Sequence, residues 1–174
     1  MMMKSVEPIE EYLDLVDEHD NVVGNKKRSE IYAENLSNYR VINAFLVNSK
    51  GELWISRRTS NKKFYPLCLD VSIGGHVESG ESYESALKRE ACEELNINID
   101  KLSYRCLGLL KPKKDNVSSF MKVYEIKMDI TPNYNREDFS EYFYFTPIEL
   151  YNRILDGEGA KSDLPKLVKY FYLD

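Results

Sequence analysis

Alternating apolar and polar residues predict a chain of short strands interrupted by helices. Residues 12–16 and 22–24 read as one hairpin around a polar turn, and residues 41–47 and 52–56 read as a second hairpin. Further strands are predicted at 70–73, 104–110, 119–129 and 141–145, with a Lys-rich loop after residue 110, and helices at 29–34, 147–155 and 162–170. This order predicts a mixed sheet flanked by helices, which is an α/β fold.

The longest helical signal covers residues 83–95. Ser82 is suited to be its N-cap, and neither proline nor glycine interrupts the segment. Leu87, Ala91 and Leu95 recur at a spacing of four residues and predict the face that packs on the sheet.

Carboxylates gather beside this apolar stripe. At about 100° per residue, Glu90 and Glu94 lie only about 40° apart, with Glu93 on the adjoining flank. Like charges one turn apart repel, and they repel more strongly when partly desolvated, so a divalent cation among them would be stabilising. Oxygen ligands suit Mg²⁺ or Mn²⁺. Arg89, four residues before Glu93, could orient a carboxylate or contact phosphate.

A solvated helix face with ordinary ion pairs is the alternative interpretation of these charges. The fixed pattern disfavours it, because Gly75, Glu81, Arg89-Glu90 and Glu93-Glu94 should coincide by composition less than about once in a million starting points.

The segment from Gly75 to Ile97, GHVESGESYESALKREACEELNI, resembles the signature box of the Nudix hydrolase family. The resemblance implies metal ligation by Glu90, Glu93, Glu94 and the backbone carbonyl of Gly75. It also implies catalytic roles for Glu93, Glu94 and Arg89, with Glu81 in support. Asn96 stands where the family pattern has a glycine, at the end of the helix, and asparagine is the usual substitute for glycine in left-handed backbone.

The resemblance implies an α/β/α sandwich with a mixed sheet, formed by a single domain over residues 1–174 in which residues 1–38 form an N-terminal hairpin and short helix. It implies a hydrolase that uses Mg²⁺ or Mn²⁺ to cleave a diphosphate linkage in a small-molecule metabolite, such as a nucleoside diphosphate derivative.

Residues outside the helix are weaker site candidates. Arg57, Arg58 and His76 are the candidate substrate-binding residues, although surface anchoring and a structural histidine are the competing interpretations. The Nudix resemblance implies a further acidic residue in the loop before the last strand, and Glu137, with Asp138 beside it, is the candidate base.

Two other functions compete with hydrolysis. LVDEHDNVVG, RRTSNKKFYP and the GGH opening resemble the branch related to isopentenyl diphosphate isomerase, but Gly74 stands where those enzymes have a catalytic cysteine and Ser119 falls near their later glutamate. A binding module without turnover is the third interpretation. Intact Glu90, Glu93 and Glu94 disfavour it, because a decayed site has no reason to keep repelling carboxylates together.

The composition of the chain limits the classes of partner that it can bind. The 174 residues, 43% hydrophobic and 30% charged, predict a globular chain, and the net charge of −5 disfavours general binding to nucleic acid or an anionic membrane. A long apolar segment and a signal-peptide pattern are both missing, so we expect a cytoplasmic protein that is not in a membrane.

Cys68, Cys92 and Cys106 lack paired spacing and are expected to be small buried side chains. The sequence leaves open whether the protein forms a homodimer.

Overall fold

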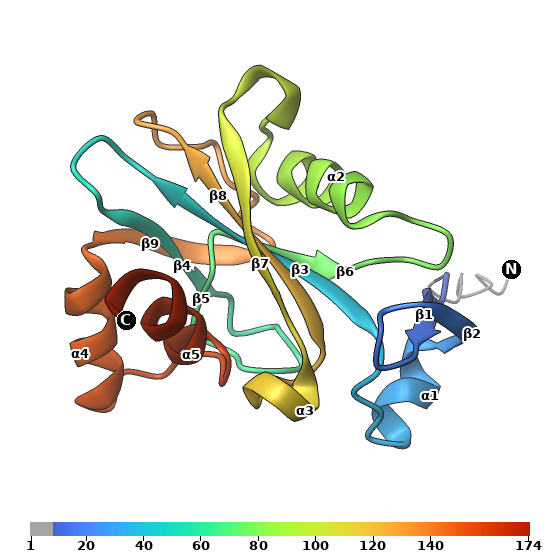
Figure 1. The fold of residues 1–174 in the computed structure, drawn as a ribbon. Helices are drawn as coiled ribbons and strands as arrows, with labels where there is room; N and C mark the ends of the chain where they lie inside the picture. Colours follow the sequence, from blue (N-terminus) through green and yellow to red (C-terminus); the bar gives the residue numbers. More distant parts are fainter. Residues whose placement is uncertain (1–8) are drawn as a thin grey trace, which may run out of the picture.

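A seven-stranded mixed sheet forms the centre of the protein (Figure 1). The computed structural model describes residues 9–174. The strands follow the order β5-β4-β3-β8-β7, while β6 also pairs with β3 and β9 with β4. β3 and β8 run parallel and the other strand pairs of this sheet run antiparallel, so the sheet is mixed as predicted. The strands are β3 (Arg40–Val47), β4 (Leu53–Arg58), β5 (Leu69–Asp70), β6 (Ile73–His76), β7 (Tyr104–Leu110), β8 (Phe120–Lys127) and β9 (Phe139–Phe145).

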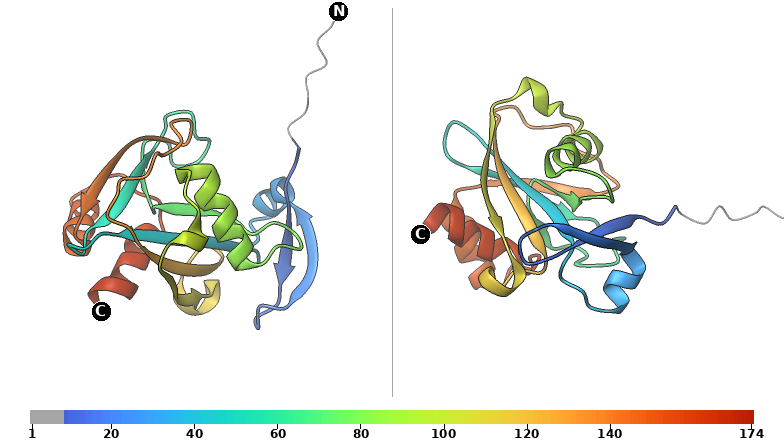
Figure 2. Two further views of the ribbon diagram at one scale, coloured as in Figure 1. Left: turned by 90° about the horizontal axis from the view of Figure 1, so that it is seen from above. Right: turned by 45° about the vertical axis from the view of Figure 1, so that its right-hand side comes forward.

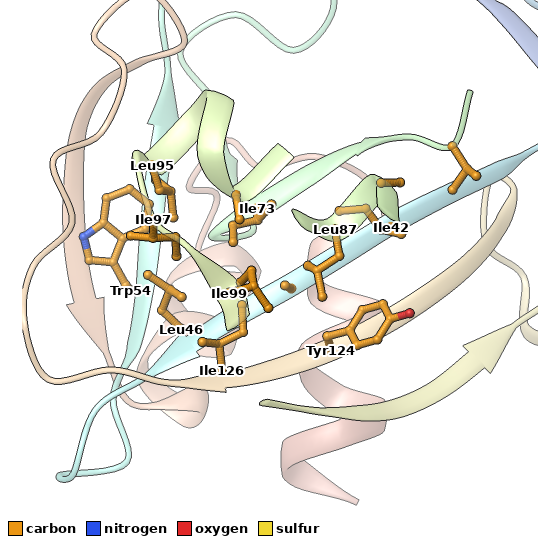
Figure 3. Packing of buried hydrophobic residues seen from close by; sticks show 14 of the residues in the cluster. Ile42, Leu46, Trp54, Ile73, Leu87, Leu95, Ile97, Ile99, Tyr124 and Ile126 are labelled. Carbon is orange, nitrogen blue, oxygen red and sulfur yellow. The ribbon is translucent and has the colours of Figure 1, made fainter. Parts of the chain in front are cut away.

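Helix α2 (Tyr83–Leu95) covers one face of this sheet. Its buried residues include Leu87, Ala91 and Leu95, the stripe that the sequence predicts. Figure 3 shows Leu87 and Leu95 in the same apolar cluster as Ile42 of β3. Because each fully buried aliphatic side chain stabilises the fold by roughly 1.5–3 kcal/mol, this contact fixes α2 firmly against the sheet.

The C-terminal helices cover the opposite face. Phe45 and Val47 of β3, which alternate with the residues facing α2, lie in a second buried cluster with Leu150 of α4 and Leu167 of α5. The three layers are visible in Figure 1 and confirm the predicted α/β/α sandwich. These helical segments are α4 (Pro147–Leu155), α5 (Leu164–Val168) and the π-helical turn η2 (Lys169–Leu173).

A smaller N-terminal unit lies at one end of the sheet, away from α4 and α5 (Figure 2). It consists of β1 (Tyr12–Val16), β2 (Val22–Lys27) and α1 (Arg28–Ala33), at the positions where the sequence predicts a hairpin and a short helix. Residues 1–8, which the prediction includes in this unit, lie outside the described part of the chain. Leu13, Ile31 and Tyr39 form its own small core.

The predicted strand at 70–73 is wrong, because two strands replace it. β5 pairs with β4 and β6 pairs with β3, and the chain changes partner at Val71-Ser72. The buried Ser72 hydroxyl accepts from Leu46 N at 2.8 Å and donates to Trp54 O, so its side chain takes over hydrogen bonds that a continuous strand would make.

Local turns also differ from the prediction. The Lys-rich loop contains the single-turn helix α3 (Pro112–Asp115), which begins with a proline and ends at Asn116 in left-handed backbone. A 3₁₀ turn, η1 (Ile99–Lys101), follows α2. Both elements are too short to leave a periodic signal in the sequence.

The expected burial of the cysteines is wrong for two of the three. Cys92 and Cys106 are exposed, and Cys68 is half-buried. Cys92 follows the buried Ala91, and one helical step of about 100° turns it away from the sheet. None of the helices within residues 9–174 combines the length and apolar character needed to cross a membrane.

Candidate active site

A cleft of about 950 Å³ runs along the side of α2 that faces the N-terminal unit. Its walls come from β3, β6, α2, the N-terminal unit, the loop at 59–68 and the start of α5. The structure brings most of the predicted site residues into this one space: Arg58, Gly75, His76, Arg89, Glu90, Glu93 and Glu94.

Gly75 leaves room for the Glu90 side chain of α2 beside β6. A Cβ atom at this position would lie 2.0 Å from Glu90 Oε1, a distance that carbon atoms of real side chains do not reach. Gly75 pairs with Ile42 in the sheet, so its backbone cannot easily retreat. The glycine therefore lets the Glu90 carboxylate lie directly against the main chain of β6.

The two ends of α2 set the position of its carboxylates. Ser85 N donates to the Ser82 hydroxyl at 3.1 Å, which confirms the predicted N-cap. Asn96 has φ 54° and ψ 35°, the left-handed C-cap that the sequence predicts. The Asn96 side chain also donates to Asn133 O at 2.6 Å and ties the helix end to the following loop.

Arg89 links three parts of the site. Its Nε and Nη2 donate to the two carboxylate oxygens of Glu81, each at 3.0 Å. Nη2 also donates to His76 O at 2.9 Å, and Nη1 donates to Glu90 Oε1 at 2.7 Å. The hydrogen bonds to Glu81, followed by those to Glu90, raise the pKa of the Arg89 guanidinium. This bidentate network makes Arg89 a positioning residue that holds the loop before α2, strand β6 and Glu90 together.

Glu90 and Glu94 are poorly solvated. The Glu90 side chain is 13% exposed, and burial raises its pKa to about 7 despite the opposing effect of Arg89. Glu94 is half-buried and accepts a hydrogen bond from Gly74 N at 3.1 Å. Burial, followed by the charge of Glu90, raises the pKa of Glu94 well above its usual range. Two adjacent carboxylates therefore resist ionisation unless positive charge joins them.

Glu93 lies at the open edge of the same face. Its side chain is 60% exposed, and its carboxylate lies 3.5 Å from Arg89 Nη1. Solvent access leaves this carboxylate free to turn toward a ligand in the cleft.

The residues present fit a hard divalent cation. Among residues 9–174, no three His, Cys, Asp or Glu side chains are already drawn together as a closed metal cage. Mg²⁺ does not need one, because it usually keeps several waters and takes one or two carboxylates together with substrate phosphates. Glu90, Glu94 and the carbonyl of Gly75 offer oxygen donors where an added positive charge would relieve the unfavourable environment of the carboxylates.

The cleft has little positive charge of its own to offer a diphosphate. Among the described residues that line it, each Arg and Lys already has a carboxylate partner. These ion pairs are Arg28–Glu11 at 3.4 Å, Arg58–Asp70 at 2.8 Å, Lys161–Asp70 at 3.6 Å, Arg89–Glu81 at 3.0 Å, and Lys62–Asp138. A polyanionic ligand would therefore need positive charge from elsewhere.

Arg57 and Glu137 are not brought into the cleft. Successive side chains of β4 point to opposite faces, so Arg58 lines the cleft while Arg57 pairs with Glu141 at 2.6 Å and Glu158 at 2.9 Å. Glu137 is exposed in the loop before β9, and its neighbour Asp138 lines the cleft instead.

His76 lines the cleft as a neutral side chain. Burial lowers its pKa to about 3, with Arg28, Lys161 and Arg89 acting in the same direction. Its Nε2 lies 2.7 Å from the Tyr32 hydroxyl. Tyr32, Phe64 and Tyr65 also line the cleft, although the sequence analysis did not name them as site residues. Phe64 and Tyr65 lie within the quoted segment RRTSNKKFYP, whereas no motif marks Tyr32.

Comparison with known proteins agrees with this geometry. The model of the NUDIX domain matches residues 38–167, more than half of the chain. The chain belongs to the Nudix family. The N-terminal unit precedes the matched residues, yet it forms one wall of the cleft.

Similar proteins support the assignment at the level of the Nudix hydrolases. An uncharacterized Nudix hydrolase from Nostoc sp. is 58% identical over 162 residues, which cover 93% of this chain and 96% of the relative. A crystal structure from Deinococcus radiodurans is 50% identical with a TM-score of 0.88, covering 93% of this chain and 99% of that one. Isopentenyl-diphosphate Delta-isomerase 2 from Photorhabdus laumondii is only 26% identical, over 82% of this chain and 81% of the relative.

Proposed function

We propose that this Nudix protein is a divalent-metal-dependent hydrolase that cleaves a diphosphate linkage in a small-molecule metabolite, such as a nucleoside diphosphate derivative. The observation that carries the proposal is the poorly solvated pair Glu90 and Glu94 in a cleft whose cationic side chains are already paired. Such a surface would repel a diphosphate unless a cation were bound with it.

Glu90, Glu94 and the Gly75 carbonyl are the proposed ligands of Mg²⁺ or Mn²⁺, with Glu93 able to join them from the open edge. When bound, the ion neutralises phosphate oxygens and lowers the pKa of water. In the reaction, water adds to phosphorus and the bridging P–O bond breaks, leaving its electron pair on the departing oxygen. A carboxylate of Glu93 or Glu94 is the proposed acceptor of the proton that the attacking water loses.

Arg89 serves this chemistry without touching the reacting atoms. Its hydrogen bonds to Glu81 and to His76 O hold the guanidinium still, and that guanidinium holds one oxygen of Glu90. The other Glu90 oxygen keeps its lone pairs for a cation. Asp138, which lines the cleft, replaces Glu137 as the loop carboxylate best placed to approach a substrate.

The residues on which isomerisation would depend do not support that function. A side-chain carbon at Gly74 would lie 3.1 Å from both Asn43 Oδ1 and Val71 Cγ2, so the site has no ready space for a catalytic thiol there. Ser119 is fully buried and lies outside the set of residues lining the cleft.

A panel of diphosphates assayed with Mg²⁺, Mn²⁺ or EDTA tests the proposal. We expect turnover of at least one nucleoside diphosphate derivative with metal, none with EDTA, and no isomerisation of isopentenyl diphosphate. Glu94→Gln should reduce kcat by at least about 100-fold, in the range of losing a catalytic carboxylate. The control is Glu84→Gln, on the same helix but outside the cleft, which should keep kcat within about twofold.

Binding of the diphosphates to the wild-type protein, measured by calorimetry, separates an enzyme from a binding module. Tight binding without turnover under any metal condition would overturn the proposed hydrolysis. Equal activity of Glu94→Gln and wild type would remove Glu94 from the mechanism.

A further inference from the structure

The loop between β6 and α2 is bound to strand β1 of the N-terminal unit (Figure 2). Ser79 N donates to Tyr12 O at 2.8 Å, and Leu13 and Glu78 form an isolated antiparallel bridge. The residues that the family model matches begin at residue 38, so these contacts join the matched domain to a segment outside it.

Asp14 of β1 holds this loop through both of its carboxylate oxygens. It is only 8% exposed, and its Oδ1 accepts from Ser79 Oγ at 2.6 Å while its Oδ2 accepts from Gly80 N at 3.0 Å. Ser79 and Gly80 are the central residues of a turn in which Glu81 N donates to Glu78 O at 2.9 Å. Gly80 has φ 81°, a left-handed value that favours glycine. Within residues 9–174 Asp14 makes no ion pair, so its polar contacts are spent on this turn.

The turn that Asp14 holds ends at the residue that orients Arg89. Glu78 N donates to Glu81 Oε2 at 3.0 Å, and Arg89 donates to both oxygens of Glu81. Arg89 Nη1 then donates to Glu90 Oε1 at 2.7 Å. A displacement of the turn would move the Glu81 carboxylate, and Arg89 would lose the bidentate contact that fixes its guanidinium beside Glu90.

We propose that Asp14 is a positioning residue for the metal site. It fixes the turn at 78–81, the turn fixes Glu81, and Glu81 together with Arg89 orients Glu90 toward the cation. This inference rests on the proposed metal-dependent hydrolysis. Asp14 lies outside the set of residues that line the cleft, so it acts only through this chain of contacts. The N-terminal unit therefore contributes to the strength of metal binding from outside the matched domain.

Calorimetric titration of Mn²⁺ into two Asp14 variants tests the proposal. We expect Asp14→Ala to bind Mn²⁺ about tenfold more weakly than wild type, at the lower end of the effect of losing a group that orients a metal ligand. Asp14→Asn should stay within about threefold of wild type. Its amide oxygen can accept from Gly80 N while its NH₂ group donates to the Ser79 hydroxyl. The comparison separates positioning from the loss of a negative charge, which both variants share.

A matched control lies in the same hairpin. Asp17 accepts from His19 N and Asn21 N, each at 2.9 Å, and so serves only its own turn. Asp17→Ala should keep the Mn²⁺ affinity within about twofold of wild type. Thermal melts should show that each variant is folded at the temperature of the titration. If Asp14→Ala does not fold, Ser79→Ala removes one of the two contacts from the other side, and it should weaken Mn²⁺ binding about threefold.

A double variant tests the path through Arg89. In an Arg89→Met protein, adding Asp14→Ala should change the Mn²⁺ affinity by less than about twofold, because the contact with Glu90 is already lost. Independent contributions would instead add in free energy, and a further tenfold loss would contradict the proposed path.

The outcomes separate this proposal from the hydrolase proposal. Mn²⁺ affinity equal to wild type in Asp14→Ala, or an equal loss in Asp14→Ala and Asp14→Asn, would overturn the positioning role and leave the hydrolase proposal intact. A wild-type protein that binds no Mn²⁺ would overturn the metal-dependent hydrolase.

In that case the NMR signal of the Arg89 Nε–H still decides the coupling. Its hydrogen bond to Glu81 at 3.0 Å should slow its exchange with solvent in wild type and Asp14→Asn, and Asp14→Ala should lose this protection. Equal protection in all three proteins would reject the positioning role.

Discussion

At the scale of single residues, the site depends on how closely Glu90 can approach the main chain. Gly75 makes this possible, since any Cβ there would overlap the Glu90 carboxylate. Burial, followed by the charge of Glu90, raises the pKa of Glu94. By setting where Glu90 lies, Gly75 affects the charge that faces Glu94 as well.

Replacing this glycine should disrupt the site. We expect Gly75→Ala to displace the Glu90 side chain and to abolish most metal-dependent turnover. The free energy of unfolding should fall by only about 0.5–1.5 kcal/mol, the range of one lost hydrogen bond, because the atoms that must move belong to one flexible side chain. Gly24→Ala is the matched control, because a Cβ at Gly24 would meet no atom within 4 Å. Thermal melts and assays of both variants check this, and a fully active Gly75→Ala would contradict the close-contact account.

Neutralising one carboxylate of the Glu90–Glu94 pair should stabilise the metal-free protein. Burial and the charge of Glu90 disfavour ionised Glu94, so Glu94→Gln should raise Tm in EDTA by about 2–4 °C, equivalent to roughly 1 kcal/mol in a chain of this size. Glu84→Gln, which removes an exposed carboxylate of the same helix, should not raise it. A lower Tm for Glu94→Gln in EDTA would show that the charge of Glu94 is already compensated without metal.

At the scale of elements, α2 is the part that could be predicted best. Its cap residues, its buried stripe and the proximity of its carboxylates all follow from local spacing, which the sequence contains directly. Contacts between distant segments could not be predicted in this way. Arg57 and Arg58 are equivalent in the sequence, and the pairing of Arg57 with Glu141 on β9 helps decide which of them faces the cleft.

The C-cap of α2 gives a prediction about stability alone. Asn96→Ala should lower the free energy of unfolding by about 1–2 kcal/mol, because alanine is unfavourable in left-handed backbone and cannot donate to Asn133 O. Asn96→Gly loses only the side-chain hydrogen bond and should fall between Asn96→Ala and wild type. Urea unfolding measures the order, and both variants should keep their turnover. An Asn96→Ala protein as stable as wild type would contradict this description of the cap.

At the scale of the whole molecule, the cleft is formed by parts that lie far apart in the sequence. The matched Nudix domain supplies β6 and α2, while the N-terminal unit supplies Tyr32 and the loop at 59–68 supplies Phe64. The family, the fold class and the acidic face of α2 could be predicted because local motifs encode them. The contact between Tyr32 and Phe64 could not, because the two rings are distant in the sequence and meet only through tertiary packing.

Arg57 connects distant parts of the molecule. Through hydrogen bonds to Glu141 and Glu158 it joins β4 to β9 and to the segment after α4. We expect Arg57→Met to lower the free energy of unfolding by about 1.5–3 kcal/mol, the range for hydrogen bonds to charged groups. With a diphosphate that the wild-type protein hydrolyses, kcat should stay within about twofold of wild type. A large loss of kcat with unchanged Tm would instead place Arg57 in the reaction, as the sequence suggests.

Calorimetric titration of Mn²⁺ into the wild-type protein, Glu94→Gln and Glu84→Gln, without substrate, tests the central claim most directly. We predict that wild type and Glu84→Gln bind the ion with the same affinity and that Glu94→Gln binds it at least about tenfold more weakly, a difference of about 1.4 kcal/mol. Equal Mn²⁺ affinity in all three proteins would contradict a metal site built on the Glu90–Glu94 face.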